Sequence, residues 1–176
     1  MNLERPLAPE PYEMLPQVPS FTLTSPTLVD GQPMPYAQLA DGDNSSPELH
    51  WSSFPAETKS FIVTCFDPDA PTPSGFWHWT IVDIDASVTS LPAGAGQSDL
   101  FLDGAAAHVK NDASTYAYYG AAPPAGDRPH RYIFAVHALD VETLDLDPQE
   151  VTPAVVAFSS LGHTLARATL TVTHQN

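Results

Sequence analysis

The sequence predicts a mainly β protein: a β-sandwich of two antiparallel sheets with Greek-key links and a short helical part near the C-terminus. Three segments have the residue types of strands that are apolar on both faces, and only one stretch, near the C-terminus, has helical periodicity. The chain also holds 19 prolines but only 9 glycines. That composition favours short strands joined by proline-rich turns over long helices.

The length of 176 residues predicts one domain and is sufficient to bury a substantial core without disulfides. Residues 1–20 are rich in proline, so we expect an irregular N-terminal arm. Residues 21–176 are expected to form a single domain. Within it, short strands are expected at 21–23 and 49–51, on either side of a turn-rich segment.

The three strongest strand patterns lie at 60–67, 76–84 and 131–139. Each is rich in aromatic and β-branched residues, which favours strand over helix. Because apolar side chains occupy both faces of each run, we expect these strands in the middle of a sheet.

The C-terminal part changes to a helical pattern. Both 147–150 and Thr152-Pro153 look like helix starts, with a capping residue followed by proline. The apolar residues that follow have the spacing i, i+4, i+7 and i+11, which predicts a buried helical stripe. They are Ala154, Phe158, Leu161 and Leu165. Residues 169–173 return to strand alternation.

The charge balance restricts the partners of the protein. Six Lys and Arg against 21 Asp and Glu give a formal charge of −15, which argues against nucleic acid and against stable anchoring to anionic membranes. No apolar run approaches the ~18 residues of a membrane span, and no signal peptide is recognisable. We therefore expect a cytoplasmic protein. The single cysteine, Cys65, lies in an expected core strand and is interpreted as an inert thiol.

Asp67-Pro68-Asp69-Ala70-Pro71 is the first segment with candidate functional residues. Two prolines rigidify the backbone where a buried strand runs into a loop, and a rigid backbone can hold Asp67 and Asp69 at a pocket. The Ala70-Pro71 bond is a candidate for the cis form. The alternative is an ordinary acidic turn.

His78 is the second candidate. Strand alternation places it on one face with Phe76, Thr80 and Val82, and Trp77 and Trp79 on the other. The alternative is a hydrogen-bonded core histidine without a ligand role.

His130 is the third candidate, flanked by Arg128 and Arg131 in a chain that has few cations. Such donors suit a carboxylate or phosphate group, and the alternative is a pair of surface arginines that balance nearby acids. We expect Asp69, His78 and His130 to converge, where they could bind an anion, bind a metal or act in acid–base chemistry. No activated-nucleophile motif and no short-spaced ligand pair occurs, so we expect neither a metal nor a cofactor.

Four ordered motifs resemble those of the phosphatidylethanolamine-binding protein family, also called Raf kinase inhibitor-like proteins, in its prokaryotic branch. They are SPELHW at 46–51, DPDAPT at 67–72, GFWHW at 75–79 and HRY at 130–132. The resemblance runs from about residue 21 to 173. It implies a β-sandwich with a small anion pocket near one end.

The resemblance also assigns site residues by motif. It matches Asp67 and Asp69 with the two acids of the DPDAPT motif and His78 with the pocket histidine of the GFWHW motif. His130 and Tyr132 match the histidine and tyrosine of the HRY motif. It places Ala121, Ala122 and Pro123 in a loop that lends backbone N–H groups to the anion. The tail at 171–174 lacks the tyrosine of many bacterial members.

These observations predict a protein that binds a small anion or a phosphate-bearing ligand. In this interpretation Asp69 orients a histidine or bonds a ligand proton, and His130 lies at the pocket rim. The resemblance further implies regulation of a protein kinase or protease partner and a homodimer. The alternative is a hydrolase or lyase that uses the Asp/His pocket.

Overall fold

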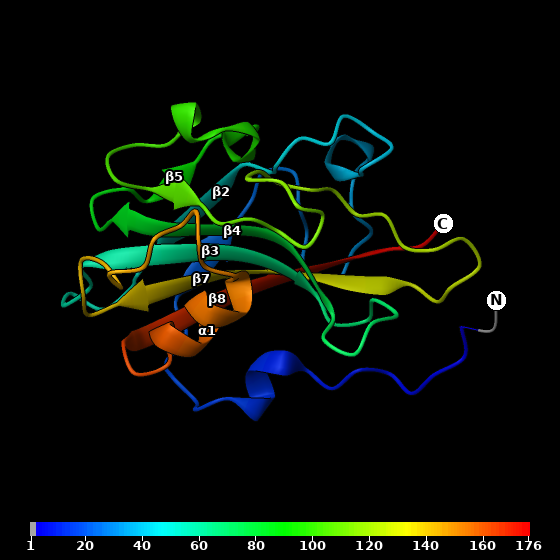
Figure 1. Cartoon of the computed structure of the whole chain (residues 1–176), viewed down its shortest axis with the longest axis horizontal. Helices are drawn as coiled ribbons and strands as arrows, with labels where there is room; N and C mark the ends of the chain where they lie inside the picture. The colour runs from blue at the N-terminus through cyan, green and yellow to red at the C-terminus, as the bar shows by residue number, and fades with distance from the viewer. Residues whose placement is uncertain (1–2) are drawn as a thin grey trace.

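The computed structural model describes residues 3–176 and confirms the mainly β fold with two antiparallel sheets (Figure 1). The larger sheet has five strands in the order β6-β4-β3-β7-β8. Their bounds are β3 (Ser60–Asp67), β4 (Phe76–Asp85), β6 (Ala107–His108), β7 (His130–Leu139) and β8 (Thr164–His174). The smaller sheet consists of β1 (Thr22–Thr24), β2 (Leu49–Ser52) and β5 (Ser90–Leu91).

The three strands with the strongest sequence pattern, β3, β4 and β7, occupy the centre of the larger sheet, as predicted. The spatial order β7-β3-β4-β6 is that of a Greek key, in which the last strand returns by a long connection to lie beside the first. The strands β5 and β6 have two residues each, too few for a sequence pattern to reveal them.

The core lies between the two sheets and depends on one face of β3. Phe61, Val63 and Cys65 point into it, and the Trp51 ring packs edge-on against Phe61 with the ring centroids 5.5 Å apart. Cys65 is fully buried, and burial raises the pKa of its thiol, consistent with an inert core residue. Ile62 points to the opposite face of the sheet.

That opposite face is covered by the N-terminal arm and by the helix α1 (Pro153–Ser160) (Figure 1). The arm includes the single 3-10 turn η1 (Pro11–Met14). Its Tyr12 hydroxyl lies 3.3 Å from Thr64 Oγ1 of β3, and Pro19 accepts a backbone hydrogen bond from Arg167 of β8. Three further 3-10 turns lie in loops: η2 (Tyr36–Gln38), η3 (Ala95–Gln97) and η4 (Asp99–Phe101).

The helix begins where the sequence predicts, but its buried stripe was assigned wrongly. Thr152 caps α1 by accepting a hydrogen bond from Val155 N–H. However, Phe158 is 77% exposed, and Val156 is the buried residue that packs beside Ile62 and Leu139. The stripe could not continue because residues 164–174 pair with β7 along its whole length.

Two other local expectations also fail. Residues 147–150 form a turn, closed by a hydrogen bond from Glu150 N–H to Asp147 C=O, and not a helix. The Ala70-Pro71 bond is trans, like every other peptide bond of the described residues. Within residues 3–176, none of the helices is long and apolar enough to span a membrane.

Candidate functional site

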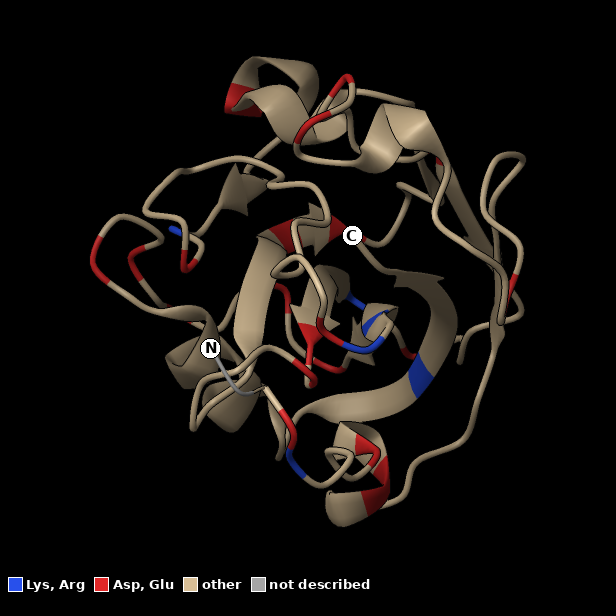
Figure 2. Cartoon of the chain, turned by 90° about the vertical axis from the view of Figure 1, so that its right-hand side faces the viewer, with Lys and Arg blue, Asp and Glu red and all other residues tan. Residues whose placement is uncertain are grey.

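A small cavity of about 190 Å³ opens at the end of the sandwich where β3 ends and β4 and β7 begin. The three meet there because β3 is antiparallel to both of its neighbours. Both chain termini lie towards this end. Figure 2 looks onto it, and acidic and basic segments lie close together near the centre of the view.

Six of the seven expected site residues line this cavity. They are Asp67, His78, Ala122, Pro123, His130 and Tyr132. Asp69 does not line it, and the other lining residues are Ala70, Pro71, Thr72, Phe76, Tyr119 and Pro124.

His130 is not the exposed rim residue that we expected. Its ring is 1% exposed, and both nitrogens contact carboxylates: Nδ1 lies 2.7 Å from Asp67 Oδ2 and Nε2 lies 2.9 Å from Asp127 Oδ2. Burial alone would lower the pKa of His130, but the two carboxylates outweigh burial and raise it. The imidazolium form therefore has no free N–H to offer a ligand.

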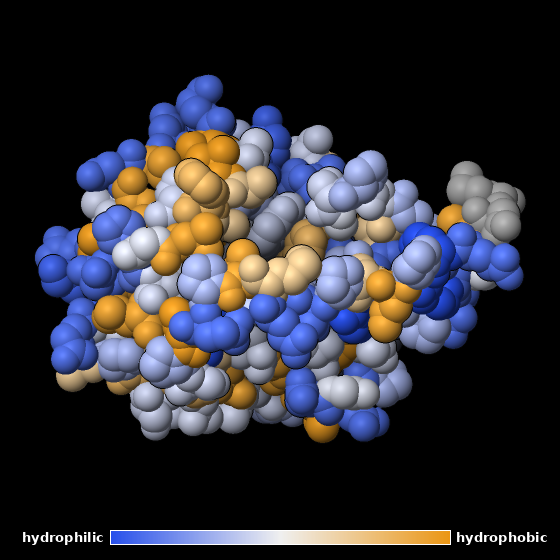
Figure 3. All heavy atoms as spheres, turned by 90° about the horizontal axis from the view of Figure 1, so that it is seen from below, coloured by the Kyte–Doolittle hydropathy of each residue, from blue (hydrophilic) through white to orange (hydrophobic). Residues whose placement is uncertain are grey.

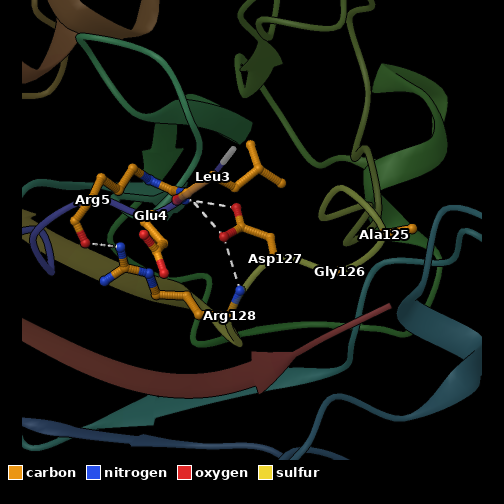
Figure 4. Close-up of a pocket in the computed structure, with 7 residues that line it drawn as sticks. All are labelled: Leu3, Glu4, Arg5, Ala125, Gly126, Asp127 and Arg128. Carbon is orange, nitrogen blue, oxygen red and sulfur yellow. Dashed lines mark hydrogen bonds and ion pairs between the residues drawn. The ribbon is translucent and has the colours of Figure 1, made fainter. Parts of the chain in front are cut away.

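Asp127 and Arg5 complete this arrangement, and sequence reasoning missed both. The Arg5 guanidinium binds the Asp127 carboxylate with two hydrogen bonds of 3.0 and 2.8 Å, and this ion pair lowers the pKa of Asp127. Arg5 also donates to the Asp69 carbonyl and accepts from the Arg128 guanidinium at its own carbonyl. Figure 4 shows Arg5 and Asp127 joined by these hydrogen bonds where both line a hollow outside the cavity.

The role expected for Asp69 is wrong. Its carboxylate accepts hydrogen bonds from Arg131 Nε at 2.7 Å and Nη2 at 2.9 Å, and from the Arg131 backbone N–H at 3.0 Å. Burial would raise the pKa of Asp69, but Arg131 outweighs it and the pKa is lowered. Asp67, not Asp69, contacts the histidine, since Asp67 is the last residue of β3 and Asp69 lies in the turn beyond it.

A β-bulge directs His78 into the cavity. Cys65 pairs with Trp79 and Phe66 pairs with Trp77, so His78 is an extra residue in β4. A bulge breaks strand alternation. The expected shared face of Trp77 and Trp79 was therefore wrong, since Trp79 is a core residue whereas Trp77 lines a groove on the other side of the sheet. Phe76 and His78 do lie together, as expected.

The surroundings of His78 keep its ring neutral. Nδ1 lies 2.8 Å from the Tyr119 carbonyl, which can only accept, so Nδ1 carries the proton and Nε2 is the acceptor. Burial lowers the pKa of His78. The ring stacks on Tyr119 and meets Tyr132 edge-on, with the centroids 5.1 Å apart.

Tyr132 offers the most informative group at this cavity. The residue is 1% exposed, and within the described chain its O–H proton has no acceptor, although the Ala122 N–H points at its oxygen. Burial and the nearby Asp67 charge raise the pKa of Tyr132, so the hydroxyl keeps its proton at neutral pH. Because buried hydroxyls nearly always find a partner, this one is available to a ligand.

The loop at residues 121–123 contributes fewer free backbone N–H groups than we expected. The Ala121 N–H donates to Gln38, and its carbonyl accepts from Ala40, so Ala121 is committed to the fold. Pro123 has no N–H. Ala122 is therefore the one residue of this expected trio that both lines the cavity and has an N–H left over, and this N–H points at the Tyr132 hydroxyl oxygen.

The cavity thus combines a hydroxyl donor, one backbone N–H and a neutral imidazole. Within residues 3–176, no group of three or more His, Cys, Asp or Glu side chains is placed to hold a metal ion. The expectation that no metal or cofactor is needed stays a prediction.

A comparison with known families gives the class of protein. The sequence profile of the phosphatidylethanolamine-binding protein family matches residues 24–175. The chain belongs to this family, as its motifs predicted.

Individual relatives agree with this assignment. The protein YbhB of Escherichia coli is 45% identical over 154 residues, which cover 85% of this chain and 96% of YbhB. The crystal structure of E. coli YbcL superposes with a TM-score of 0.85 at 39% identity, covering 89% of this chain and 99% of YbcL. A homologue from Chlamydia trachomatis gives a TM-score of 0.76 at 30% identity, over 89% of this chain and 98% of that one.

Proposed function

We propose that the chain binds a small anion or the phosphate group of a larger ligand in the cavity between His78 and Tyr132. The buried, unpartnered Tyr132 hydroxyl carries this proposal, because a buried donor without a partner costs free energy that a bound anion would recover. A cavity of about 190 Å³ suits a headgroup rather than an entire lipid.

Neutral donors hold the anion in this proposal. The nearby cations are already paired, since His130 lies between two carboxylates and Arg131 binds Asp69. The Tyr132 O–H and the Ala122 N–H are dipoles that can bind an anion without adding net charge. In this proposal such neutral donors, and not an imidazolium, let a chain of charge −15 bind an anion.

The experiment is calorimetric titration with inorganic phosphate and with sulfate, for the natural chain and for Tyr132→Phe. Losing one hydrogen bond to a charged ligand should weaken binding about tenfold, roughly 1.4 kcal/mol. Tyr36→Phe is the matched control, because the Tyr36 hydroxyl is exposed and bonds only the Asp41 carbonyl. Equal affinities for the natural chain and Tyr132→Phe would refute the proposal.

The pH dependence of sulfate binding then tests the role of His78. Sulfate keeps its charge across the range, so any change comes from the protein. Because burial lowers the pKa of His78, affinity should be flat around neutral pH and rise only in acid, where Nε2 becomes a donor. A fall in affinity between pH 7 and pH 8 would instead assign the binding to a different histidine.

Regulation of a kinase or protease partner and a homodimer depend on the family resemblance alone and stay predictions. The cytoplasmic location, which was inferred from the sequence, also stays a prediction. The hydrolase or lyase alternative requires a free base beside the substrate. Both His130 nitrogens contact carboxylates. The unprotonated His78 Nε2 is a weak base because burial lowers the pKa of this ring, which favours binding over catalysis.

A further inference from the structure

A second cavity of about 350 Å³ lies on the opposite face of the larger sheet, between the N-terminal arm and α1. We call it the arm groove. Most of its lining is apolar, and the sheet, the arm and the helix all contribute. The residues that matter here are Leu15, Ile62, Phe66, Trp77, Ala157 and Leu161.

Arg167 is the exception in this apolar lining. Its Nε donates to His137 Nδ1 at 3.2 Å, and its guanidinium carbon lies 4.6 Å from the centroid of the Tyr12 ring. Among residues 3–176, no carboxylate lies within ion-pair distance of Arg167, although the chain has 21 acidic residues. A neighbouring, more open hollow is lined by Tyr12 and Arg167 together with Glu10 and Glu13. Neither glutamate forms an ion pair with Arg167, and Glu10 is paired with Arg131.

His137 does not neutralise this cation. Its Nδ1 accepts the hydrogen bond from Arg167, so the ring is neutral and carries its proton on Nε2. Burial and the Arg167 charge lower the pKa of His137 to about 3. The groove therefore contains a half-buried guanidinium that has no carboxylate partner among residues 3–176.

We propose that the arm groove binds a small amphipathic carboxylate, with its alkyl chain among the apolar side chains and its carboxylate on Arg167. A half-buried cation without a counter-ion is unfavourable, and a ligand carboxylate removes that cost. The planar guanidinium suits two parallel hydrogen bonds to a carboxylate. Small-molecule sites span roughly 300–1,000 Å³, so a cavity of about 350 Å³ fits a compact ligand.

The surface around the groove favours a small molecule over a second protein. Figure 3 views the side along which the arm runs, where hydrophobic residues form separate groups between polar ones. A stable protein interface would bring a broader apolar patch. The site is separate from the anion cavity, because the two cavities share no lining residue.

The first test titrates decanoate and the uncharged decanol into the natural chain by calorimetry. Decanoate should bind at least about tenfold more tightly than decanol. Arg167→Gln should remove this preference by weakening decanoate alone, whereas Arg167→Lys should keep part of it. Lys59→Gln is the matched control, since it removes one exposed positive charge far from the groove lining.

A second variant guards against a fold defect in Arg167→Gln. Ala157→Phe places a ring in the groove from α1 and should weaken decanoate and decanol alike by about tenfold. Val155→Phe adds the same ring on the exposed side of α1 and should change neither. Tyr132→Phe should leave decanoate binding unchanged, which separates this site from the anion cavity.

Two outcomes would overturn the proposal. One is decanoate affinity that is equal in the natural chain, Arg167→Gln and Ala157→Phe. The other is sedimentation showing that Ala157→Phe turns a dimer into a monomer while decanoate affinity stays the same. That second result would make the groove an interface between two copies of the chain.

Discussion

The two histidines of β7 are both buried, yet their surroundings shift their pKa values in opposite directions. His130 at the start of the strand contacts Asp67 and Asp127, and its pKa is raised. His137, seven residues later, accepts a hydrogen bond from Arg167, and its pKa is lowered to about 3. Burial favours the neutral ring at both positions, so the charged neighbour decides the outcome.

The contrast also distinguishes the two cavities. Beside His130 the cations are paired within the protein, because His130 and Arg5 contact Asp127 and Arg131 contacts Asp69. At His137 the neighbouring Arg167 remains unbalanced. We therefore expect neutral donors to bind an anion beside His130, and a charged donor to bind one beside His137.

The largest effect should come from His130→Ala. This change leaves the Asp67 and Asp127 carboxylates without their shared partner in a buried setting, so the free energy of unfolding should fall by about 3 kcal/mol. Urea denaturation measures the loss. The folded pKa of His130 lies above 6.5, so its stabilisation is complete below pH 6.5 and disappears as pH rises through the raised value. The difference in free energy of unfolding between the natural chain and the variant should therefore decrease at alkaline pH.

His50→Ala is the matched control for this experiment. His50 also contacts a carboxylate, Glu48, at 2.6 Å, but both side chains are largely exposed and water screens the pair. Its unfolding midpoint should barely move. A stability loss at His50 as large as that at His130 would show that burial between two carboxylates is not the cause.

A smaller effect should follow from His137→Leu, and here the free energy of unfolding differs most from that of the natural chain in acid, not at alkaline pH. The natural His137 has a folded pKa of about 3 against 6.5 unfolded, so the unfolded chain gains a proton as pH falls from 6.5 towards 3 and stability is lost. At pH 5 this loss is about 2 kcal/mol, from roughly 1.5 pH units at ~1.4 kcal/mol each. The His137→Leu variant should not show this loss of stability.

The measurement compares urea midpoints at pH 7 and pH 5 for both chains. His163→Leu is the control, since His163 is exposed beside Asp140 and should keep the acid sensitivity of the natural chain. Other buried histidines are common to all three proteins and cancel. An equal loss of stability in His137→Leu would contradict the assigned pKa.

The central strands could be predicted because their composition is local information. The bounds of β3 agree at both ends with the apolar run in the sequence, and β4 and β7 differ by one residue at a single end. The cavity residues His78 and His130 could also be located, since motifs place them beside strand starts. The helix stripe failed because strand pairing with β7 overrode helical periodicity from residue 164.

The partners of the charged residues could not be predicted. Arg5 reaches Asp127 across 122 residues of sequence, and no pattern in a single chain reports such a contact. Asp127 offered only a weak signal, an acid three residues before His130. The His137–Arg167 contact follows from the β7–β8 register, which places the two residues directly opposite each other.

The smallest effect should come from Arg5→Gln, and it tests how far the arm influences the His130 cluster. Asp127 keeps its contact with His130 when Arg5 is removed, and the Arg5 side chain is 24% exposed, so the unfolding midpoint should shift less than in His130→Ala. The sharper readout is the pKa of His130, measured by NMR titration. Arg5 Nη2 lies 3.5 Å from His130 Nε2, so removing this cation should raise the pKa of His130 further and leave that of His137 unchanged.

Arg128→Gln is the control, because the Arg128 side chain donates to the Arg5 carbonyl and not to Asp127. If Arg5→Gln and Arg128→Gln shift the pKa of His130 equally, the effect comes from the position of the arm and not from the Arg5 charge.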